Sequence, residues 1–209
     1  MQVLAVGAHP DDIEIGAGAL IHRLAGRGHD VWMLILTDDG VTGWMRRGES
    51  AAAAKVLGVD PGRLLFGGLR DGYLRADGDA VTLVRRLTAE LSPVLVVTHT
   101  AADSHNDHAE AERITRAAFR RRVIWHYSVQ LSAEPAQFRP DVWLSVSAAE
   151  ARVKADALAE HVTQRDRLAR MDLGEYETRM GARNGSGGRA EAFEVTVQEG
   201  ADGGVAARL

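Results

Sequence analysis

Apolar residues gather in short continuous runs along the first half of the chain, and longer segments of mixed polarity separate them. The runs cover residues 3–8, 31–37, 64–69 and 94–99. A strand that is covered on both faces has a continuous apolar run, because both sides of its pleat meet the core. The runs therefore predict buried, parallel strands.

The segments between these runs have the pattern of helices. We expect helices over residues 13–26, 46–57, 79–91 and 107–120. Strand and helix then alternate about every thirty residues, which is the spacing of βαβ crossovers. The pattern predicts an α/β fold, Rossmann-like and doubly wound, with a mostly parallel sheet and helices on both faces.

The alternation loosens after residue 122, although strands are still expected over 123–129 and 142–146. Ser147 and Glu150 have the spacing of a capping box, which predicts a helix from Ala148 to about His161.

The remaining C-terminal segments are predicted from their composition and alternation. Residues 182–190 are rich in Gly, Ser and Asn and predict a mobile loop, and residues 193–197 alternate like an edge strand. We expect a single domain over residues 1–209, with the parallel α/β core over about 1–130, C-terminal helices and the edge strand over about 131–200, and a flexible tail at 200–209.

Composition narrows the function classes. The 209 residues carry a net charge of −4, so nothing indicates a nucleic-acid-binding surface. No apolar stretch is long enough to predict a membrane span, and the N-terminus has the pattern of a strand rather than a signal peptide. A cytoplasmic location is therefore expected. The chain has no cysteine, so a metal site would need histidines and carboxylates.

Polar residues cluster directly after the first and fourth predicted strands, at residues 8–12 and 99–108. In a sheet of order 3-2-1-4-5 these strands are neighbours at the topological switch point, where ligands bind. We therefore expect the two clusters to face each other. They bring together three candidate histidines and four aspartates, namely His9, His105, His108, Asp11, Asp12, Asp103 and Asp107.

These residue types are the ligands of a catalytic zinc site. His9 and Asp12 lie three residues apart and can share one ion, which leaves Asp11 as a free carboxylate for a general base. His108 lies near the start of the fourth predicted helix, where the helix dipole favours the neutral, ligating imidazole.

Structural roles compete with these functional ones. Asp11 or Asp12 could cap the helix that starts at residue 13, and Asp107 is interpreted as an N-cap rather than a ligand. Asp103 is expected to orient a histidine rather than to bind the metal.

A dinucleotide-binding module is the natural rival for this fold, but the first turn argues against it. The Gly-x-Gly-x-x-Gly fingerprint is missing after the first strand, where Gly7 is followed by Ala8 and His9. Gly16 and Gly18 come too late, inside the predicted helix, where close packing explains them.

Ala-His-Pro-Asp-Asp at residues 8–12 and Ser-His-Asn-Asp-His at residues 104–108 resemble the PIG-L/LmbE family of zinc-dependent N-acetylglucosaminyl deacetylases. The chain departs from the family at Asn106, where proline is usual, and we expect a changed loop with retained activity. Further likeness is carried by Glu49, residues 69–74, Lys154, Ala157, Leu158, His161, Gln164 and residues 190–193.

The resemblance implies a role for each matching residue. It implies one zinc ion per chain held by His9, Asp12 and His108, with Asp11 as general base and His105 stabilising the oxyanion. It also implies that Asp71 and one arginine, Arg46 or Arg47, contact the sugar. Trp44 could stack on a sugar face or be a partly buried loop residue.

The expected function is zinc-dependent hydrolysis of an N-acetyl group on an amino-sugar-containing small molecule, which releases acetate and a free amine. The expected partner is an N-acylated sugar conjugate, and relatives often form homo-oligomers. Either Asp11 or His105 would protonate the leaving amine. Two alternatives remain at this point: a zinc hydrolase of another amide or ester, and a non-catalytic sugar- or nucleotide-binding module.

Overall fold

The computed structural model describes residues 1–38, 43–130, 137–185, 187–199 and 201, so nearly all of the predicted tail at 200–209 lies outside it. The parallel part consists of β1 (Gln2–Gly7), α1 (Asp12–Gly26), β2 (Asp30–Thr37), α2 (Gly43–Leu57), β3 (Leu64–Leu69), α3 (Gly78–Leu87), β4 (Leu95–His99), α4 (Asn106–Ala118) and β5 (Val123–Tyr127). The C-terminal part consists of β6 (Val142–Val146), α5 (Ala148–Ala159), α6 (Arg165–Leu168), α7 (Leu173–Arg183) and β7 (Arg189–Val197).

The strands form one sheet in the order β3-β2-β1-β4-β5-β7-β6. The first five are parallel, which confirms the predicted order 3-2-1-4-5 and the α/β class. β7 pairs antiparallel with β5 and β6 pairs antiparallel with β7, so the sheet is mostly rather than fully parallel. The capping box at Ser147 is present, and α5 begins after it as predicted.

The predictions around the last strand were partly wrong. β7 begins at Arg189, inside the segment 182–190 that was expected to be a loop, and α7 extends to Arg183. The first half of β7 pairs with β6 and the second half with β5. The first half of β7 was not predicted because it contains the buried, charged Glu191. The charge of Glu191 is paired with Lys154, which is distant in the sequence, so no local pattern reveals the pairing.

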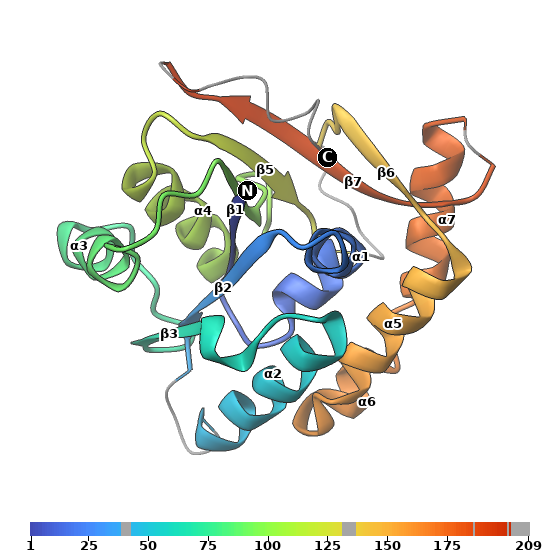
Figure 1. Cartoon of the computed structure of the whole chain (residues 1–209), viewed down its shortest axis with the longest axis horizontal. Coiled ribbons are helices and arrows are strands. Elements are labelled where there is room, and N and C mark those ends of the chain that lie inside the picture. The colour runs from blue at the N-terminus through green and yellow to red at the C-terminus, as the bar shows by residue number, and fades with distance from the viewer. Residues whose placement is uncertain (39–42, 131–136, 186, 200, 202–209) are drawn as a thin grey trace.

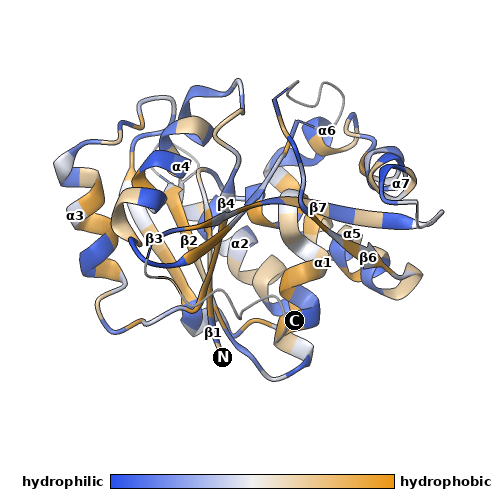
Figure 2. Ribbon diagram, turned by 90° about the horizontal axis from the view of Figure 1, so that it is seen from above, coloured by the Kyte–Doolittle hydropathy of each residue, from blue (hydrophilic) through white to orange (hydrophobic). Residues whose placement is uncertain are grey.

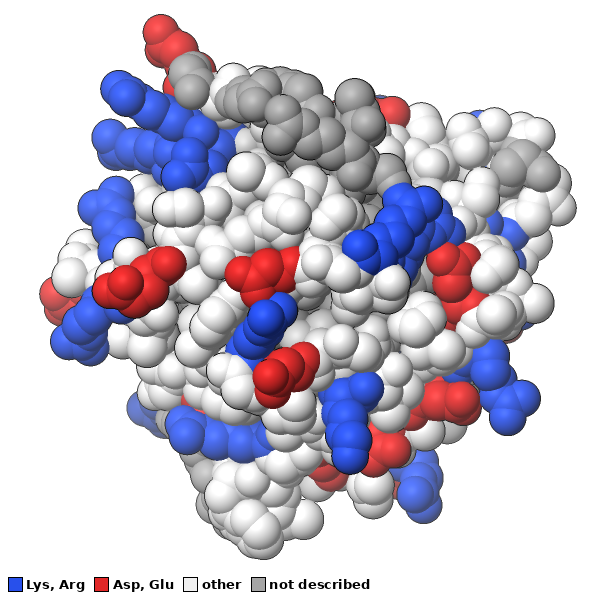
Figure 3. Space-filling model, in the orientation of Figure 1, with Lys and Arg blue, Asp and Glu red and all other residues white. Residues whose placement is uncertain are grey.

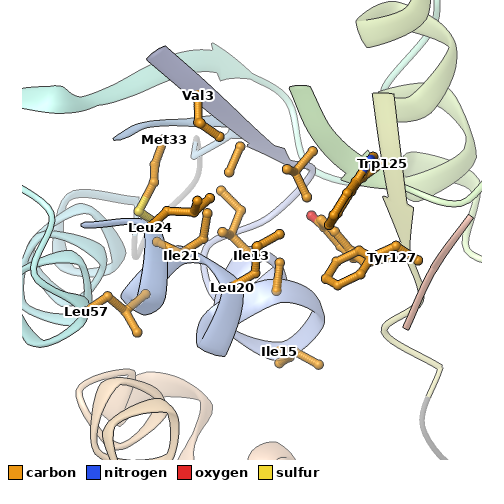
Figure 4. Close-up of a cluster of buried hydrophobic side chains, with 14 of the residues drawn as sticks. Val3, Ile13, Ile15, Leu20, Ile21, Leu24, Met33, Leu57, Trp125 and Tyr127 are labelled. Carbon is orange, nitrogen blue, oxygen red and sulfur yellow. The ribbon is translucent and has the colours of Figure 1, made fainter. Parts of the chain in front are cut away.

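Alternate side chains of the central strands face opposite layers of helices. Val3 and Ala5 pack into a core with α1 and α2, whereas Leu4 and Val6 pack into a second core with α3 and α4. Figure 1 shows α3 and α4 on one side of β1 and β2, with α1, α2 and α5 on the other. Figure 2 shows the apolar strands between these layers, and Figure 4 shows side chains of the larger core. Burial on both faces explains the continuous apolar runs.

Gly16 and Gly18 of α1 are packing positions, as expected. A Cβ at Gly16 would lie 2.1 Å from the Tyr127 ring, and a Cβ at Gly18 would lie 2.9 Å from the Lys154 side chain. Helix α1 can therefore lie directly against β5 and α5, with no room for a nucleotide loop there.

Helix α1 is broken at Ala17, where φ is −144°. The freed amides of Ala19 and Leu20 donate to the buried Glu191 carboxylate of β7, at 2.8 Å each. Lys154 Nζ of α5 lies 2.7 Å from Glu191 and 3.0 Å from Glu177 of α7. Burial lowers the pKa of Lys154, but the two carboxylates outweigh burial and raise it. This ion cluster joins the C-terminal elements to α1.

The surface carries charges of both signs. On the face that Figure 3 shows, basic and acidic side chains lie interspersed over much of the surface. Among the helices that the structure describes, none combines the length and the apolar composition that crossing a membrane requires.

We predict that Lys154→Met destabilises the protein by about 3–5 kcal/mol, because it removes the buried cation that pairs with the carboxylates of Glu191 and Glu177. The matched control is Arg152→Ala on the same helix, since Arg152 and Asp156 form an ion pair whose side chains are 79 % and 56 % exposed. The control should change the free energy of unfolding by less than about 0.5 kcal/mol. Urea denaturation of both variants measures the difference, and equal effects would refute the structural role of the cluster.

Candidate active site

In the turn between β1 and α1, the Asp12 carboxylate folds back onto the backbone of the same turn. Asp11 has φ 95°, in the left-handed region, which reverses the chain before the helix begins. The His9 amide then donates to Asp12 Oδ2 at 2.7 Å. Asp11 occupies the N-cap position without a side-chain capping bond, so the capping alternative does not explain its carboxylate.

The two polar clusters meet across β1 and β4, which are hydrogen-bonded neighbours. His9 Nδ1 lies 3.2 Å from Asp12 Oδ2 and 3.2 Å from His108 Nε2, and His108 Nε2 lies 3.5 Å from Asp12 Oδ1. A tetrahedral ion with ligand bonds of about 2.0–2.2 Å separates its ligand atoms by about 3.3–3.6 Å. The three side chains therefore lie about as close together as the ligands of one tetrahedral ion, with Asp12 facing His9 through Oδ2 and His108 through Oδ1.

In both His9 and His108, a carboxylate contacts the ring nitrogen that faces away from the other two proposed ligands. His108 Nδ1 is 3.0 Å from Asp103 Oδ2, and His9 Nε2 is 3.0 Å from Asp71 Oδ1. Metal-ligating histidines usually donate their second N–H to such a group, which fixes the tautomer and leaves the other nitrogen free for the ion. Asp103 thus lies where its predicted orienting role requires, and Asp71, whose side chain is 53 % exposed, faces both His9 and solvent.

The prediction that Asp107 is an N-cap was wrong. His105 is the N-cap residue of α4, and its Nδ1 accepts the Asp107 amide at 3.2 Å. The Asp107 carboxylate instead accepts the amides of Gly72 and Leu74 at 2.6 and 3.1 Å. It anchors the loop that carries Asp71, a long-range role that the local capping pattern could not indicate.

His105 stacks on the His108 ring with a centroid separation of 4.3 Å. Because Nδ1 accepts a backbone amide, neutral His105 carries its proton on Nε2. Burial and the neighbouring His108 and His9 lower the pKa of His105, which favours this neutral form. His105 therefore offers an N–H donor beside the predicted ligands.

Sequence reasoning missed His99, the last residue of β4. Its ring stacks on the opposite side of the His108 imidazole at 4.2 Å, and its Nε2 lies 3.2 Å from Asp12 Oδ2. The same Nε2 accepts the Ala8 amide at 3.0 Å, so its lone pair is already used. His99 therefore joins β4 to the turn between β1 and α1 that carries His9 and Asp12. Its place at the strand end, level with the first cluster, was the available signal.

Asp11 is fully buried beside this group, and its carboxylate is paired with Arg167 of α6. Burial and the charge of Asp12 raise the pKa of Asp11 to about 6, while Arg167 opposes that rise. Arg46 Nη2 donates to the Pro10 carbonyl at 2.8 Å and lies 3.9 Å from Asp11. Arg167 was also missed, because a partner 156 residues away leaves no local signal.

The two candidate sugar-binding arginines face different neighbours. Arg46 lies against the Pro10–Asp11 backbone, whereas Arg47 is paired with Asp38 and stacks over Phe66. The geometry thus favours Arg46 as the arginine that faces the site. Trp44, on the first turn of the same helix, is 76 % exposed and available to a ligand.

The ligand group is electrostatically suited to a cation. Burial raises the pKa of Asp12, but His108, His99 and His9 outweigh burial and hold that pKa well below its usual value. Burial lowers the pKa of His9, yet Asp12 and Asp71 raise it to about 10. The carboxylates of Asp12 and Asp71 therefore attract positive charge, either a proton or a metal ion.

Comparison with known proteins decides the family. Residues 4–119 match the PIG-L family, described as GlcNAc-PI de-N-acetylase. The chain belongs to this family. It is 30 % identical over 168 residues to YaiS of Escherichia coli, described as an uncharacterized deacetylase, covering 76 % of this chain and 89 % of YaiS. The match confirms the family predicted from the two motifs and the predicted N-deacetylase class of enzyme.

A second relative is the 1D-myo-inositol 2-acetamido-2-deoxy-alpha-D-glucopyranoside deacetylase of Corynebacterium glutamicum, 32 % identical over 162 residues. The match covers 61 % of this PIG-L chain and 56 % of the Corynebacterium protein, so the chain spans about half the length of that relative.

Solved structures support the fold. The N,N'-diacetylchitobiose deacetylase of Pyrococcus horikoshii has a TM-score of 0.79 at 20 % identity, covering 94 % of this chain and 84 % of its own. A 4-carboxy-2-hydroxymuconate hydratase from Pseudomonas putida has a TM-score of 0.75 at 20 % identity, covering 93 % and 95 %. The same fold thus carries different chemistry, and the residues of the site must decide the function.

Within the part of the chain that the structure describes, three other groups of side chains could also hold an ion: His9, His105 and His108; Asp12, His99 and His108; and His9, Asp71 and Asp107. We predict that His9→Gln, Asp12→Asn and His108→Gln each lower metal affinity by more than about 10²-fold. This loss is larger than the one caused by removing a residue that only hydrogen-bonds to a metal ligand. His99→Gln and His105→Gln should keep the metal, and His22→Gln, on the far side of α1, serves as control. Elemental analysis with circular dichroism checks this, and metal loss in His105→Gln would assign the ion to another group.

Proposed function

We propose that this PIG-L family chain is a zinc-dependent N-deacetylase that hydrolyses an acetamide on an amino-sugar conjugate. The observation that carries the proposal is the ligand group of His9, Asp12 and His108, spaced at 3.2–3.5 Å beside the buried Asp11. Two relatives named as deacetylases support the reaction, and the inositol glucosaminide acted on by the Corynebacterium relative supports the substrate class.

The donor set fits zinc. Two imidazole nitrogens and a carboxylate leave a fourth position open, as in catalytic zinc sites. A zinc ion held there would polarise the acetamide carbonyl and make a neighbouring water more acidic. The carboxylates behind His9 and His108 hold both rings in the ligating tautomer.

Asp11 is proposed as the general base. It takes a proton from the attacking water as the water oxygen bonds to the acetyl carbon. His105 donates its Nε2 proton as a hydrogen bond to the oxygen that becomes negative. The C–N bond then breaks, the amine receives the proton, and acetate and a free amino sugar leave.

The rim of the site offers groups suited to a sugar. Asp71 has an exposed carboxylate, Arg46 presents a guanidinium beside the Asp11 turn, and Trp44 exposes an indole on the same helix. Carboxylate and guanidinium groups hydrogen-bond to hydroxyls, and an aromatic face packs against a sugar ring. These three residues are proposed substrate contacts.

The function is tested by acetate release. The metal-loaded chain should release acetate from N-acetylglucosaminyl-inositol or from N-acetylglucosamine oligosaccharides, chelation should abolish release, and added zinc should restore it. Metal binding without acetate release from any N-acetylated sugar would favour a hydrolase of another amide or ester, or a hydratase like that of Pseudomonas putida. A chain that binds no metal would refute the proposal.

Asp11 and Asp12 are neighbours with opposite proposed roles, so they give a sharp paired test. Asp11→Asn should keep its zinc and lose roughly 10²–10⁴ in kcat, the usual contribution of a positioned base. Asp12→Asn removes an anionic ligand, so it should lose zinc and regain part of its activity in excess zinc. Zinc content and kcat of both variants, with and without added zinc, separate the roles. Rescue of Asp11→Asn by zinc would reverse them.

A further inference from the structure

The segment after α5 takes no part in the proposed reaction, although it lies against the candidate base. It comprises residues 161–168, namely the 3₁₀ turn Val162–Gln164 and helix α6 with the preceding His161. The family match ends at residue 119, so this segment lies outside the matched region. Figure 1 shows α6 at the end of α5, close to α2.

The first anchor of this segment is on α2. The Thr163 amide donates to Glu49 Oε1 at 2.8 Å, and the Thr163 hydroxyl donates to Glu49 Oε2 at 2.7 Å. A carboxylate that accepts two bonds from one residue fixes both the position and the orientation of that residue. Glu49 and Gln164 were singled out in the sequence only for their family likeness, and the anchor gives Glu49 a physical role.

The second anchor is on α1. His161 and Glu14 are both fully buried, and His161 Nε2 lies 3.3 Å from Glu14 Oε1. Glu14 lies two residues after Asp12 on helix α1. The segment is thereby attached to the two helices that flank Asp11.

Beyond these anchors, helix α6 presents Arg167 to the proposed base Asp11. Arg167 Nη2 donates to Asp11 Oδ2, and Arg167 Nε donates to Gln164 Oε1 at 3.3 Å. Asp11 Oδ1 has no hydrogen-bond partner within the part of the chain that the structure describes. One oxygen of the carboxylate is therefore held by the guanidinium, and the other is left uncommitted.

We propose that residues 161–168 form a brace in which Arg167 is the positioning residue for Asp11. Arg167 fixes the rotation of the carboxylate through Oδ2, so that Oδ1 is presented to the reacting water. This inference rests on the proposed function, because it assigns Asp11 as the base. It adds a C-terminal element to the catalytic constellation.

Orientation matters here because the backbone alone does not set the carboxylate. Asp11 has a left-handed backbone conformation, and its side chain makes no capping hydrogen bond to α1. The orientation of its carboxylate therefore depends on the side chains that contact it. A displacement of about 1 Å of a reacting group can cost roughly 10²-fold in rate. Arg46, at 3.9 Å, is too distant to replace the direct bond.

The test is Arg167→Ala in the zinc-loaded chain, on the N-acetylated sugar from which the wild type releases acetate. We expect kcat to fall roughly 10–10²-fold with KM and zinc content unchanged. Methylguanidinium in the assay should raise kcat of the variant but not of the wild type, because it can refill the guanidinium position. Glu49→Gln, which weakens the first anchor, should lower kcat by a smaller factor.

Arg170→Ala is the matched control, since Arg170 is an exposed arginine three residues beyond Arg167. It should leave kcat unchanged. An Arg167→Ala chain that is as active as the wild type, or more active, would overturn the positioning role. So would a loss of activity that methylguanidinium does not restore.

A crystal structure of Arg167→Ala decides the inference without a substrate. The Asp11 carboxylate should rotate or become disordered, while His9, Asp12 and His108 keep their positions. An unmoved carboxylate overturns the brace. If the carboxylate of the variant rotates as expected but the wild-type chain releases no acetate, the brace is supported and the proposed function is refuted.

Discussion

The buried carboxylate of Asp12 is the group on which the site depends. It accepts the His9 amide within its own turn and lies within 3.5 Å of nitrogens from His9, His99 and His108. These contacts join the turn after β1 to the end of β4 and the start of α4. A charge buried this deeply is stable only when paired and hydrogen-bonded, so the surrounding imidazoles and amide are a structural requirement as well as a chemical one.

The chain satisfies buried carboxylates in two different ways. At Glu191 the compensating charge is Lys154, a permanent cation that also lies 3.0 Å from Glu177. At Asp12 the neighbours are imidazoles, each of which can bind either a proton or, in its neutral form, a metal ion. The first arrangement holds helices together. The second leaves positive charge exchangeable, so that a metal ion can take the place of the proton on His9.

The parallel core could be predicted from the sequence because its signals are local. Continuous apolar runs identified β1 to β4, and the position of the two polar clusters identified the site from the strand order alone. What could not be predicted depends on contacts between distant segments. Asp107 looks like a helix cap from its neighbours, but it accepts amides from the loop at Gly72 and Leu74. His99 looks like a core strand residue, and Arg167 like a solvated surface charge.

The same contrast bears on how function arises in this fold. A hydratase and a deacetylase share the architecture, so the sheet supplies only a place where loops from β1 and β4 converge. The proposed metal ligands come from these two loops, which lie inside the family match. The arginine that pairs with Asp11, the proposed base, comes from the C-terminal segment, which the matched region does not include. Changes in that segment are expected to alter the orientation of Asp11 while the proposed ligands are retained, because the segment is anchored through Glu49 and Glu14 and not through the side chains of His9, Asp12 or His108.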